Sequence, residues 1–93
     1  MFEWDERKRL SNLKKHGVDF ADALEFGWET ATVTIDDRFN YGEERLVAVG
    51  LYRGDVHVVI YTERKLVKRL ISFRKATERE AQEFFEQNRP QRL

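Results

Sequence analysis

Four short segments rich in β-branched residues constrain the fold of this chain more than any other feature. They cover residues 31–35, 45–51, 56–62 and 66–73. Only two short turns, Arg53-Gly54-Asp55 and Glu63-Arg64-Lys65, separate the last three segments. Strands joined by turns this short lie side by side and run antiparallel. We therefore predict an antiparallel meander, with the continuous apolar segment 56–62 at the centre of the sheet.

The N-terminal part predicts a short strand followed by a helix. Residues 2–4 alternate between apolar and polar, which is typical of a strand. Asp5 is a favourable N-cap for a helix that runs to about His16, and Gly17 suits the left-handed position that ends such a helix. The side chains of this helix that we expect to face inward are Leu10 and Leu13.

Two further helices are predicted from their capping residues. Asp19 caps a short second helix that ends at Gly27, and its buried side is expected to hold Phe20, Ala23, Leu24 and Phe26. Thr77 and Glu80 form a capping box that opens a C-terminal helix. The inward-facing residues of that helix are expected to be Ala81, Phe84 and Phe85. Pro90 marks its end, and residues 90–93 are expected to be a frayed tail.

The resulting order of elements, β-α-α-β-β-β-β-α, predicts an α+β fold. A helical pair packs on a four- to five-stranded antiparallel sheet, and a C-terminal helix follows. The chain has 93 residues, without an internal repeat or an interdomain linker. We therefore expect residues 1–93 to form a single domain.

The charged residues lie in blocks of one sign, although their sum is zero. There are 17 Lys and Arg residues against 17 Asp and Glu residues. Segments 7–15 and 64–75 contain bases and no acid, whereas segment 19–37 contains acids and no base. If the basic segments fold onto one face, that face attracts polyanions whatever the total charge. The alternative is that each block is a solvated face that pairs with a block of opposite sign.

Several classes of protein are excluded or disfavoured by what the sequence lacks. The absence of cysteine excludes disulfides and thiolate metal sites, and it fits a reducing cytoplasm. No apolar run approaches the length of a membrane span, and the start MFEWDERKRL has no signal-peptide core. The two histidines lie far apart, and no nucleotide-binding or nucleophile-elbow motif is present. We therefore expect a cytoplasmic protein with no metal, no cofactor and no membrane partner.

The basic and titratable residues suit the metal-free cleavage of RNA. Lys8, Asn12, Lys15 and His16 are spaced so that they share one face of the first helix. Cleavage needs a base for the 2′-hydroxyl, an acid for the leaving 5′-oxygen and cations for the phosphorane oxygens. Histidine and glutamate carry out such proton transfers, and arginine binds phosphate through two parallel donors.

Six motifs that occur in order resemble the BrnT family of bacterial toxins. They are F-E-W-D at 2–5, N-L-K-K-H-G-V-D-F at 12–20, D-R at 37–38, Y-G-E-E-R at 41–45, Y-T-E-R at 61–64 and R-L-I-S-F-R-K-A at 69–76. The resemblance implies a RelE-like fold and a ribonuclease of a type II toxin–antitoxin module that arrests translation and growth. It also implies a BrnA-like antitoxin, which neutralises the toxin and carries the DNA-binding segment, so that the complex represses its own operon.

Residues inside these motifs or on the same helix face are the candidates for the site. We predict that the catalytic residues are Lys15, His16, Glu44, Arg69 and Arg74. The residues predicted to bind RNA or phosphate are Lys8, Asn12, Arg45, Arg64 and Ser72. Arg69 and Arg74 are expected on phosphate, Lys15 and His16 at the proton-transfer end, and Glu44 as a spare general base.

Structural interpretations of the same residues remain open. His16 serves equally to cap a helix C-terminus, and His57 fits a structural position in an apolar strand. Arg69 and Arg74 are also placed to pair with glutamates of the final helix, and Trp4 and Trp28 are suited to packing. Two other functions use the same fold: a non-catalytic module that binds RNA or the ribosome, and a protein-interaction domain.

Overall fold

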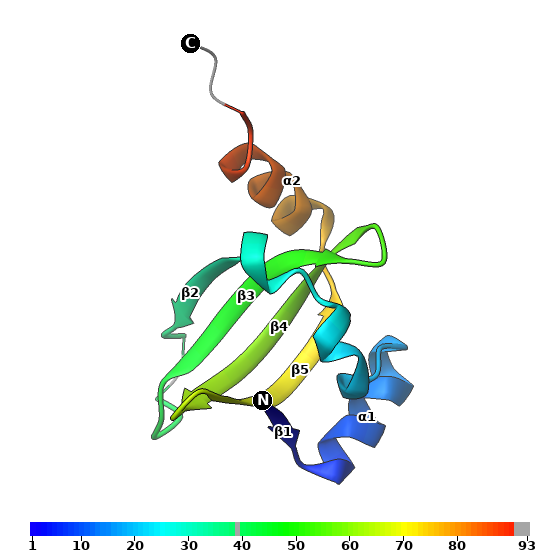
Figure 1. Cartoon of the computed structure of the whole chain (residues 1–93), viewed down its shortest axis with the longest axis vertical. Coiled ribbons are helices and arrows are strands. Elements are labelled where there is room, and N and C mark those ends of the chain that lie inside the picture. The colour runs from blue at the N-terminus through cyan, green and yellow to red at the C-terminus, as the bar shows by residue number, and fades with distance from the viewer. Residues whose placement is uncertain (39, 91–93) are drawn as a thin grey trace.

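The computed structural model of the protein describes residues 1–38 and 40–90. The strands and helices follow one another along the chain in nearly the order that the sequence predicts, with two 3₁₀ helices in place of the second helix (Figure 1). The elements are β1 (Phe2–Trp4), α1 (Glu6–His16), the 3₁₀ helices η1 (Phe20–Glu25) and η2 (Trp28–Thr30), β2 (Thr32–Asp36), β3 (Arg45–Tyr52), β4 (Asp55–Arg64), β5 (Val67–Lys75) and α2 (Glu78–Gln87).

The sheet has five strands in the order β1-β5-β4-β3-β2. The meander from β2 to β5 is antiparallel, and β4 is the central strand of the sheet, as predicted. The prediction of a purely antiparallel sheet is wrong, because β1 pairs in parallel with β5, from Phe2 opposite Lys68 to Trp4 opposite Leu70. No hairpin joins these two strands, so turn length does not fix their relative direction. The sheet is therefore mixed.

Two tight turns connect the long strands of the meander. Tyr52 pairs with Asp55 and Arg64 with Val67, so each hairpin loop contains two residues. The loop residues all have positive φ angles: Arg53 49°, Gly54 83°, Lys65 50° and Leu66 69°. Two consecutive residues with positive φ define the mirror-image turn whose twist matches that of antiparallel strands. The two hairpins thereby fix the register of β3, β4 and β5.

The hydrophobic core lies between one face of the sheet and the 3₁₀ segments that cross it (Figure 1). Phe20, Ala23 and Phe26 are buried against sheet residues that include Ala48, Val59, Tyr61, Leu70 and Phe73. Gly50 is required at this contact, because a Cβ atom there would lie 2.8 Å from Cζ of Phe26. Trp28 joins the same core and donates a hydrogen bond from Nε1 to the carbonyl of Ala23 at 2.8 Å, so its predicted packing role is confirmed.

Helix α1 has the predicted caps but not the predicted inward face. The Asp5 side chain accepts from the backbone N–H groups of Arg7 and Lys8, and Gly17 ends the helix with a φ of 72°. Leu10 and Leu13, which we expected to face inward, are 52% and 37% exposed, and Asn12 is buried instead. The prediction was wrong because α1 contacts the sheet along β5 through a polar residue rather than through its apolar stripe.

The segment predicted as a second α-helix is the 3₁₀ helix η1. The Asp19 side chain caps it as expected, but the helix ends at Glu25 rather than at Gly27. Leu24, predicted to be buried, is 82% exposed. A 3₁₀ helix has three residues per turn, so the face shared by Phe20 and Ala23 does not include Leu24.

The C-terminal helix α2 starts with the predicted capping box. The Thr77 hydroxyl accepts from the Glu80 N–H, and the Glu80 carboxylate accepts from the Thr77 N–H at 2.9 Å. Phe84 is buried as predicted, but Phe85 is 59% exposed and lies on the outer face of the helix. Of the predicted frayed tail, 90–93, all except Pro90 falls outside the described residues.

Candidate active site

A groove between α1 and β5 brings together five of the ten predicted site residues. Its lining consists of Lys8, Ser11, Asn12, Lys15, His16, Ile71 and Ser72. The helical spacing places Lys8, Asn12, Lys15 and His16 on the side of α1 that faces β5. Lys8 and Lys15 are exposed, whereas His16 is half-buried at the end of the helix.

A bulge in β5 shapes the other wall of this groove. The register of β4 and β5 shifts between Ile60, which pairs with Ser72, and Tyr61, which pairs with Leu70. Ile71 is therefore the extra residue of β5, and both Ile71 and Ser72 line the groove. Bulges turn side chains out of the regular alternation of a strand and are common beside active sites.

The electrostatic environment of His16 favours its neutral form. Partial burial lowers the pKa of His16 below its ordinary value of 6.5, and the positive charges of Lys15 and Arg74 lower it further. At neutral pH the imidazole is therefore unprotonated and has a free lone pair. A neutral imidazole beside cationic groups is suited to accept a proton in a groove that attracts phosphate.

Arg74, at the end of β5, is bound tightly to the start of α2. Its Nη1 and Nη2 atoms donate to the two carboxylate oxygens of Glu80 at 2.7 and 2.9 Å. This pairing is the structural alternative that the sequence left open for Arg74. The hydrogen bonds to Arg74 hold the pKa of Glu80 at about 2, so the carboxylate stays ionised over the physiological range. The guanidinium group is consequently fixed in position.

Asn12 lines the groove, but its side chain is hydrogen-bonded to the protein backbone. Nδ2 donates to the carbonyl of Val18 at 3.0 Å and to that of Phe73 at 2.7 Å, and Oδ1 accepts from the Phe73 N–H at 3.2 Å. Asn12 is only 7% exposed. These bonds hold α1 against β5, so we do not include Asn12 among the groups available to RNA.

A second group of predicted residues lies apart from the first. Glu44, Arg64 and Arg69 line a separate hollow together with Glu3, Gly42, Glu43, Thr62 and Glu63. None of the described residues lines both this hollow and the α1–β5 groove. Arg69 forms an ion pair with Glu3 of β1 at 3.4 Å rather than with the final helix. The two exposed arginines make this hollow partly cationic, although four acidic residues also border it.

Arg45 belongs to a polar cluster around the connection between β2 and β3. Its guanidinium lies over the Tyr41 ring, 3.8 Å from the centroid, and its Nε has no hydrogen-bond partner among the described residues. Asp36 is buried and accepts from Arg38 Nε at 2.9 Å and Arg38 Nη2 at 3.0 Å. The paired hydrogen bonds from Arg38 hold the pKa of Asp36 at about 2.

Arg38 is not among the site residues predicted from the sequence, although the D-R motif contains it. The pKa of Arg74 is raised mainly by its hydrogen bonds to Glu80, and the charge of Arg38 opposes this shift. Arg38 thus lies within electrostatic range of Arg74, even though the two residues are 36 positions apart in the chain (74 − 38). The D-R motif was the feature of the sequence that pointed to Arg38. Its position relative to Arg74 depends on the folded sheet, which brings the two arginines into range of each other.

The described ranges, residues 1–38 and 40–90, contain neither a cluster of metal ligands nor a membrane-spanning helix. In these ranges no group of three or more His, Cys, Asp or Glu side chains is placed to hold a metal ion. No helix in the same ranges is long and apolar enough to cross a membrane.

Fold and site together define a small α+β protein whose cationic groove carries a neutral histidine, a class suited to binding and cleaving phosphodiesters. A comparison with protein families finds a match over residues 4–80 to the family described as "Ribonuclease toxin, BrnT, of type II toxin-antitoxin system". The chain belongs to this family, and the resemblance noted from its motifs is confirmed. A comparison with curated proteins finds no match. The protein is thus a ribonuclease toxin, with RNA as its target and an antitoxin protein as its partner.

Proposed function

We propose that this toxin is an endoribonuclease that cleaves RNA without a metal ion, and that the α1–β5 groove is its active site. The observation that carries this proposal is the position of His16, whose lowered pKa leaves it unprotonated in a groove lined by Lys8 and Lys15. A base and cations side by side are the groups that an attack by the RNA 2′-hydroxyl requires.

In the proposed reaction, His16 accepts the proton of the 2′-hydroxyl as the 2′-oxygen forms a bond to phosphorus. The bond from phosphorus to the 5′-oxygen breaks, and the protonated amine of Lys15 supplies the proton for that leaving oxygen. The charges of Lys8 and Arg74 stabilise the extra negative charge on the phosphorane oxygens. Arg74 suits this role because two hydrogen bonds to Glu80 fix its orientation before RNA binds. The Ser72 hydroxyl, on the β5 wall of the groove, is available to bind a phosphate oxygen.

The second hollow extends the proposed RNA path rather than the catalytic centre. Arg64 and Arg69 are exposed there, and their guanidinium groups suit the phosphates of neighbouring nucleotides. Arg45 is opposite Asp36 in the pairing of β2 with β3 and lies 3.9 Å from Glu43, which lines the hollow, so we assign Arg45 to the same path. Glu44 lines this hollow and not the His16 groove, so we give the role of general base to His16 and not to Glu44.

Family membership supports the remaining parts of the proposal. We propose a BrnA-like antitoxin that neutralises the toxin, carries the DNA-binding segment and represses the operon in complex with the toxin. We further propose a RelE-like fold, a single toxin domain over residues 1–93 and action in the cytoplasm, where translation takes place. The sheet covered by helical segments on one face and by α2 at the other supports the fold assignment.

The proposal is tested with toxin freed from antitoxin and incubated with total RNA in the presence of EDTA. We expect cleavage that persists in EDTA, is lost in His16→Gln and Lys15→Ala, and is kept in the matched control Lys14→Ala, which lies outside the groove. Cleavage that stops in EDTA would contradict metal independence. Folded toxin that leaves RNA intact, with and without ribosomes, would contradict catalysis. Salt-sensitive RNA binding would then favour the non-catalytic module.

A further inference from the structure

The outer strand β2 has a free edge with exposed apolar side chains. It is the last strand of the sheet and pairs only with β3 among the described residues. Val33 and Ile35 are 46% and 59% exposed, and they share one face of the strand. The strand sequence T-V-T-I-D contains no lysine or proline, the residues that usually protect an edge from pairing with another chain. The edge is therefore competent to pair with an additional strand.

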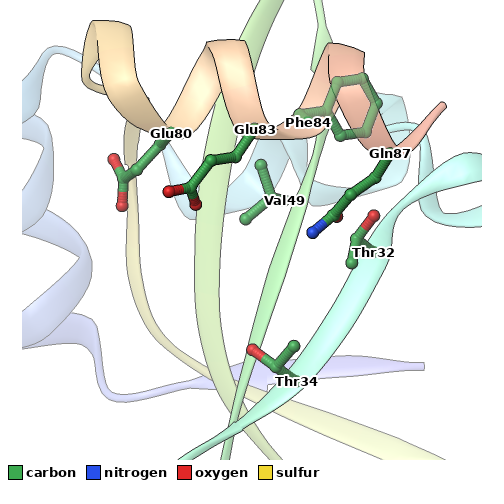
Figure 2. Close-up of a pocket in the computed structure, with 7 residues that line it drawn as sticks. All are labelled: Thr32, Thr34, Val49, Glu80, Glu83, Phe84 and Gln87. Atoms are coloured by element: carbon green, nitrogen blue, oxygen red, sulfur yellow. The ribbon is translucent and has the colours of Figure 1, made fainter. Parts of the chain in front are cut away.

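An acidic pocket lies on the other face of the same strand. It sits between α2 and the strands β2 and β3, and its lining comprises Thr32, Thr34, Val49, Glu80, Glu83, Phe84 and Gln87. Figure 2 shows Glu83 and Gln87 reaching from α2 toward the sheet, with Val49 between them and Thr32 beside the end of Gln87. No lysine or arginine is among these lining residues.

Glu83 is the acidic group of this pocket that is left for a partner. The ionised carboxylate of Glu80 is already paired with Arg74 through two hydrogen bonds. Glu83 contacts Arg79 at 3.4 Å, but the two side chains are 63% and 88% exposed, and pairs this exposed contribute little stability. A cation that enters the pocket can therefore displace Arg79 from Glu83 with little loss.

The two faces of β2 together specify the kind of segment that fits its edge. Side chains alternate between the faces of an extended segment. A strand added beside β2 therefore directs every second residue toward Val33 and Ile35, and the residues between them toward the pocket of Glu83. Apolar residues suit the first face, and Lys or Arg suits the second.

We propose that an extended segment of the antitoxin, with alternating apolar and basic residues, pairs with the free edge of β2 and places a basic side chain on Glu83. The identity of the partner rests on the toxin–antitoxin function of the family. RNA does not suit this edge, because its phosphates would face Glu83 in a pocket whose lining includes no lysine or arginine, unlike the hollow that contains Arg64 and Arg69. A second copy of the chain is also disfavoured, because antiparallel pairing of two β2 strands would bring two Glu83 pockets together.

The proposed edge is separate from the proposed active site. The groove lies against β5, whereas β2 is separated from β5 by β3 and β4. Variants at β2 should therefore affect antitoxin binding without affecting RNA cleavage. This separation makes the docking proposal testable independently of the catalytic one.

The experiment uses the antitoxin encoded beside the toxin gene and hydrogen exchange of the toxin, alone and in complex. We expect exchange of the Thr32–Asp36 amides to slow on complex formation. The double variant Val33→Lys/Ile35→Lys, and separately Glu83→Lys, should weaken antitoxin binding at least about tenfold while RNA cleavage stays unchanged. The matched controls are Leu66→Lys, an exposed leucine in the β4–β5 turn, and Glu86→Lys, which lies outside the pocket. Both controls should bind as the wild type does.

Three results would overturn the docking proposal. They are unchanged exchange at β2 in a tight complex, protection of β2 by self-association of the toxin alone, and no binding of this antitoxin to the wild-type toxin. A failure of the catalytic proposal is distinguishable from all three. If only the catalytic proposal fails, the wild-type toxin does not cleave RNA, whereas the protection of β2 in the complex and the effects of the β2 variants on antitoxin binding remain.

Discussion

The side-chain amide of Asn12 and the backbone of Phe73 form a reciprocal pair of hydrogen bonds. Nδ2 donates to the Phe73 carbonyl at 2.7 Å, and the Phe73 N–H donates to Oδ1 at 3.2 Å. The pairing of β1 with β5 ends at Leu70, so Asn12 satisfies backbone groups at the edge of β5 beyond the end of β1. A helix side chain thus continues the hydrogen bonding of the sheet and fixes α1 beside β5.

We predict that Asn12→Ala destabilises the protein by about 2–4 kcal/mol, because it leaves buried backbone groups of Val18 and Phe73 without partners. The measurement is urea unfolding followed by circular dichroism. Asn12→Asp should be at least as harmful, since a carboxylate cannot donate to the two carbonyls. The neighbouring control Ser11→Ala is exposed and should change the free energy of unfolding by less than about 0.5 kcal/mol. An equal loss in both variants would contradict this role.

We predict that RNA cleavage is lost on acidification because His16 becomes protonated. Its pKa lies below 6.5, so kcat/KM should rise with pH up to that pKa and then stay level through neutral pH. The measurement is a pH profile of cleavage with a short RNA substrate. His16→Gln should lower cleavage by roughly 10²–10⁴-fold, and the residual rate should lose this dependence. A wild-type profile that shows no fall in rate at any acidic pH at which the toxin stays folded would exclude His16 as the base.

We predict that the Arg74–Glu80 pair contributes stability that disappears in acid. The pKa of Glu80 is lowered from 4.5 to about 2, so the contribution is complete above about pH 4.5 and falls as the pH drops toward 2. The measurement is the free energy of unfolding across this pH window. Glu80→Gln should be less stable by about 1–3 kcal/mol at pH 7 and should lack this part of the acid dependence.

The matched control for this pair is Glu86→Gln. Glu86, which is also on α2, pairs at 3.0 Å with Arg89 just beyond the end of the helix, but both side chains are about two-thirds exposed. Its replacement should leave the stability almost unchanged. If Glu80→Gln unfolds with the same acid dependence as the wild type, another carboxylate is responsible.

We predict that Tyr52 makes the protein less stable in strong alkali. Its burial, together with a hydrogen bond of 2.5 Å from its hydroxyl to Asp22, raises its pKa from 10 to about 12. The folded state therefore holds the proton more tightly than the unfolded state, and stability falls as the pH rises from 10 to 12. An absorbance titration of the phenol, compared with Tyr52→Phe, measures this pKa. A tyrosine that titrates entirely near pH 10 would contradict the assignment.

Local sequence signals predicted most of the secondary structure. The caps Asp5, Asp19 and Thr77 lie where the sequence places them, because a capping side chain bonds to backbone only two or three residues away. The Arg53-Gly54 hairpin also follows from local turn chemistry. The second turn does not: it was predicted at Glu63-Arg64-Lys65, with Leu66 in the next strand, but it is formed by Lys65 and Leu66. The inward faces of the helices were predicted less well: Leu10, Leu24 and Phe85 are exposed. Which face of a helix is buried depends on the element packed against it, and periodicity does not name that element.

The same distinction between local and long-range interactions applies to the candidate site. By itself the sequence determined the motifs, the capped helices, the meander and the family to which the chain belongs. The tertiary structure alone decided that β1 runs parallel to β5, that Asn12 is structural, that Arg74 is held by Glu80, and that Glu44 lies away from His16. The physical reason is the separation along the chain of the residues that interact. Caps and tight turns form between residues a few positions apart, whereas strand order and the convergence of charges depend on the packing of segments that are distant in the chain.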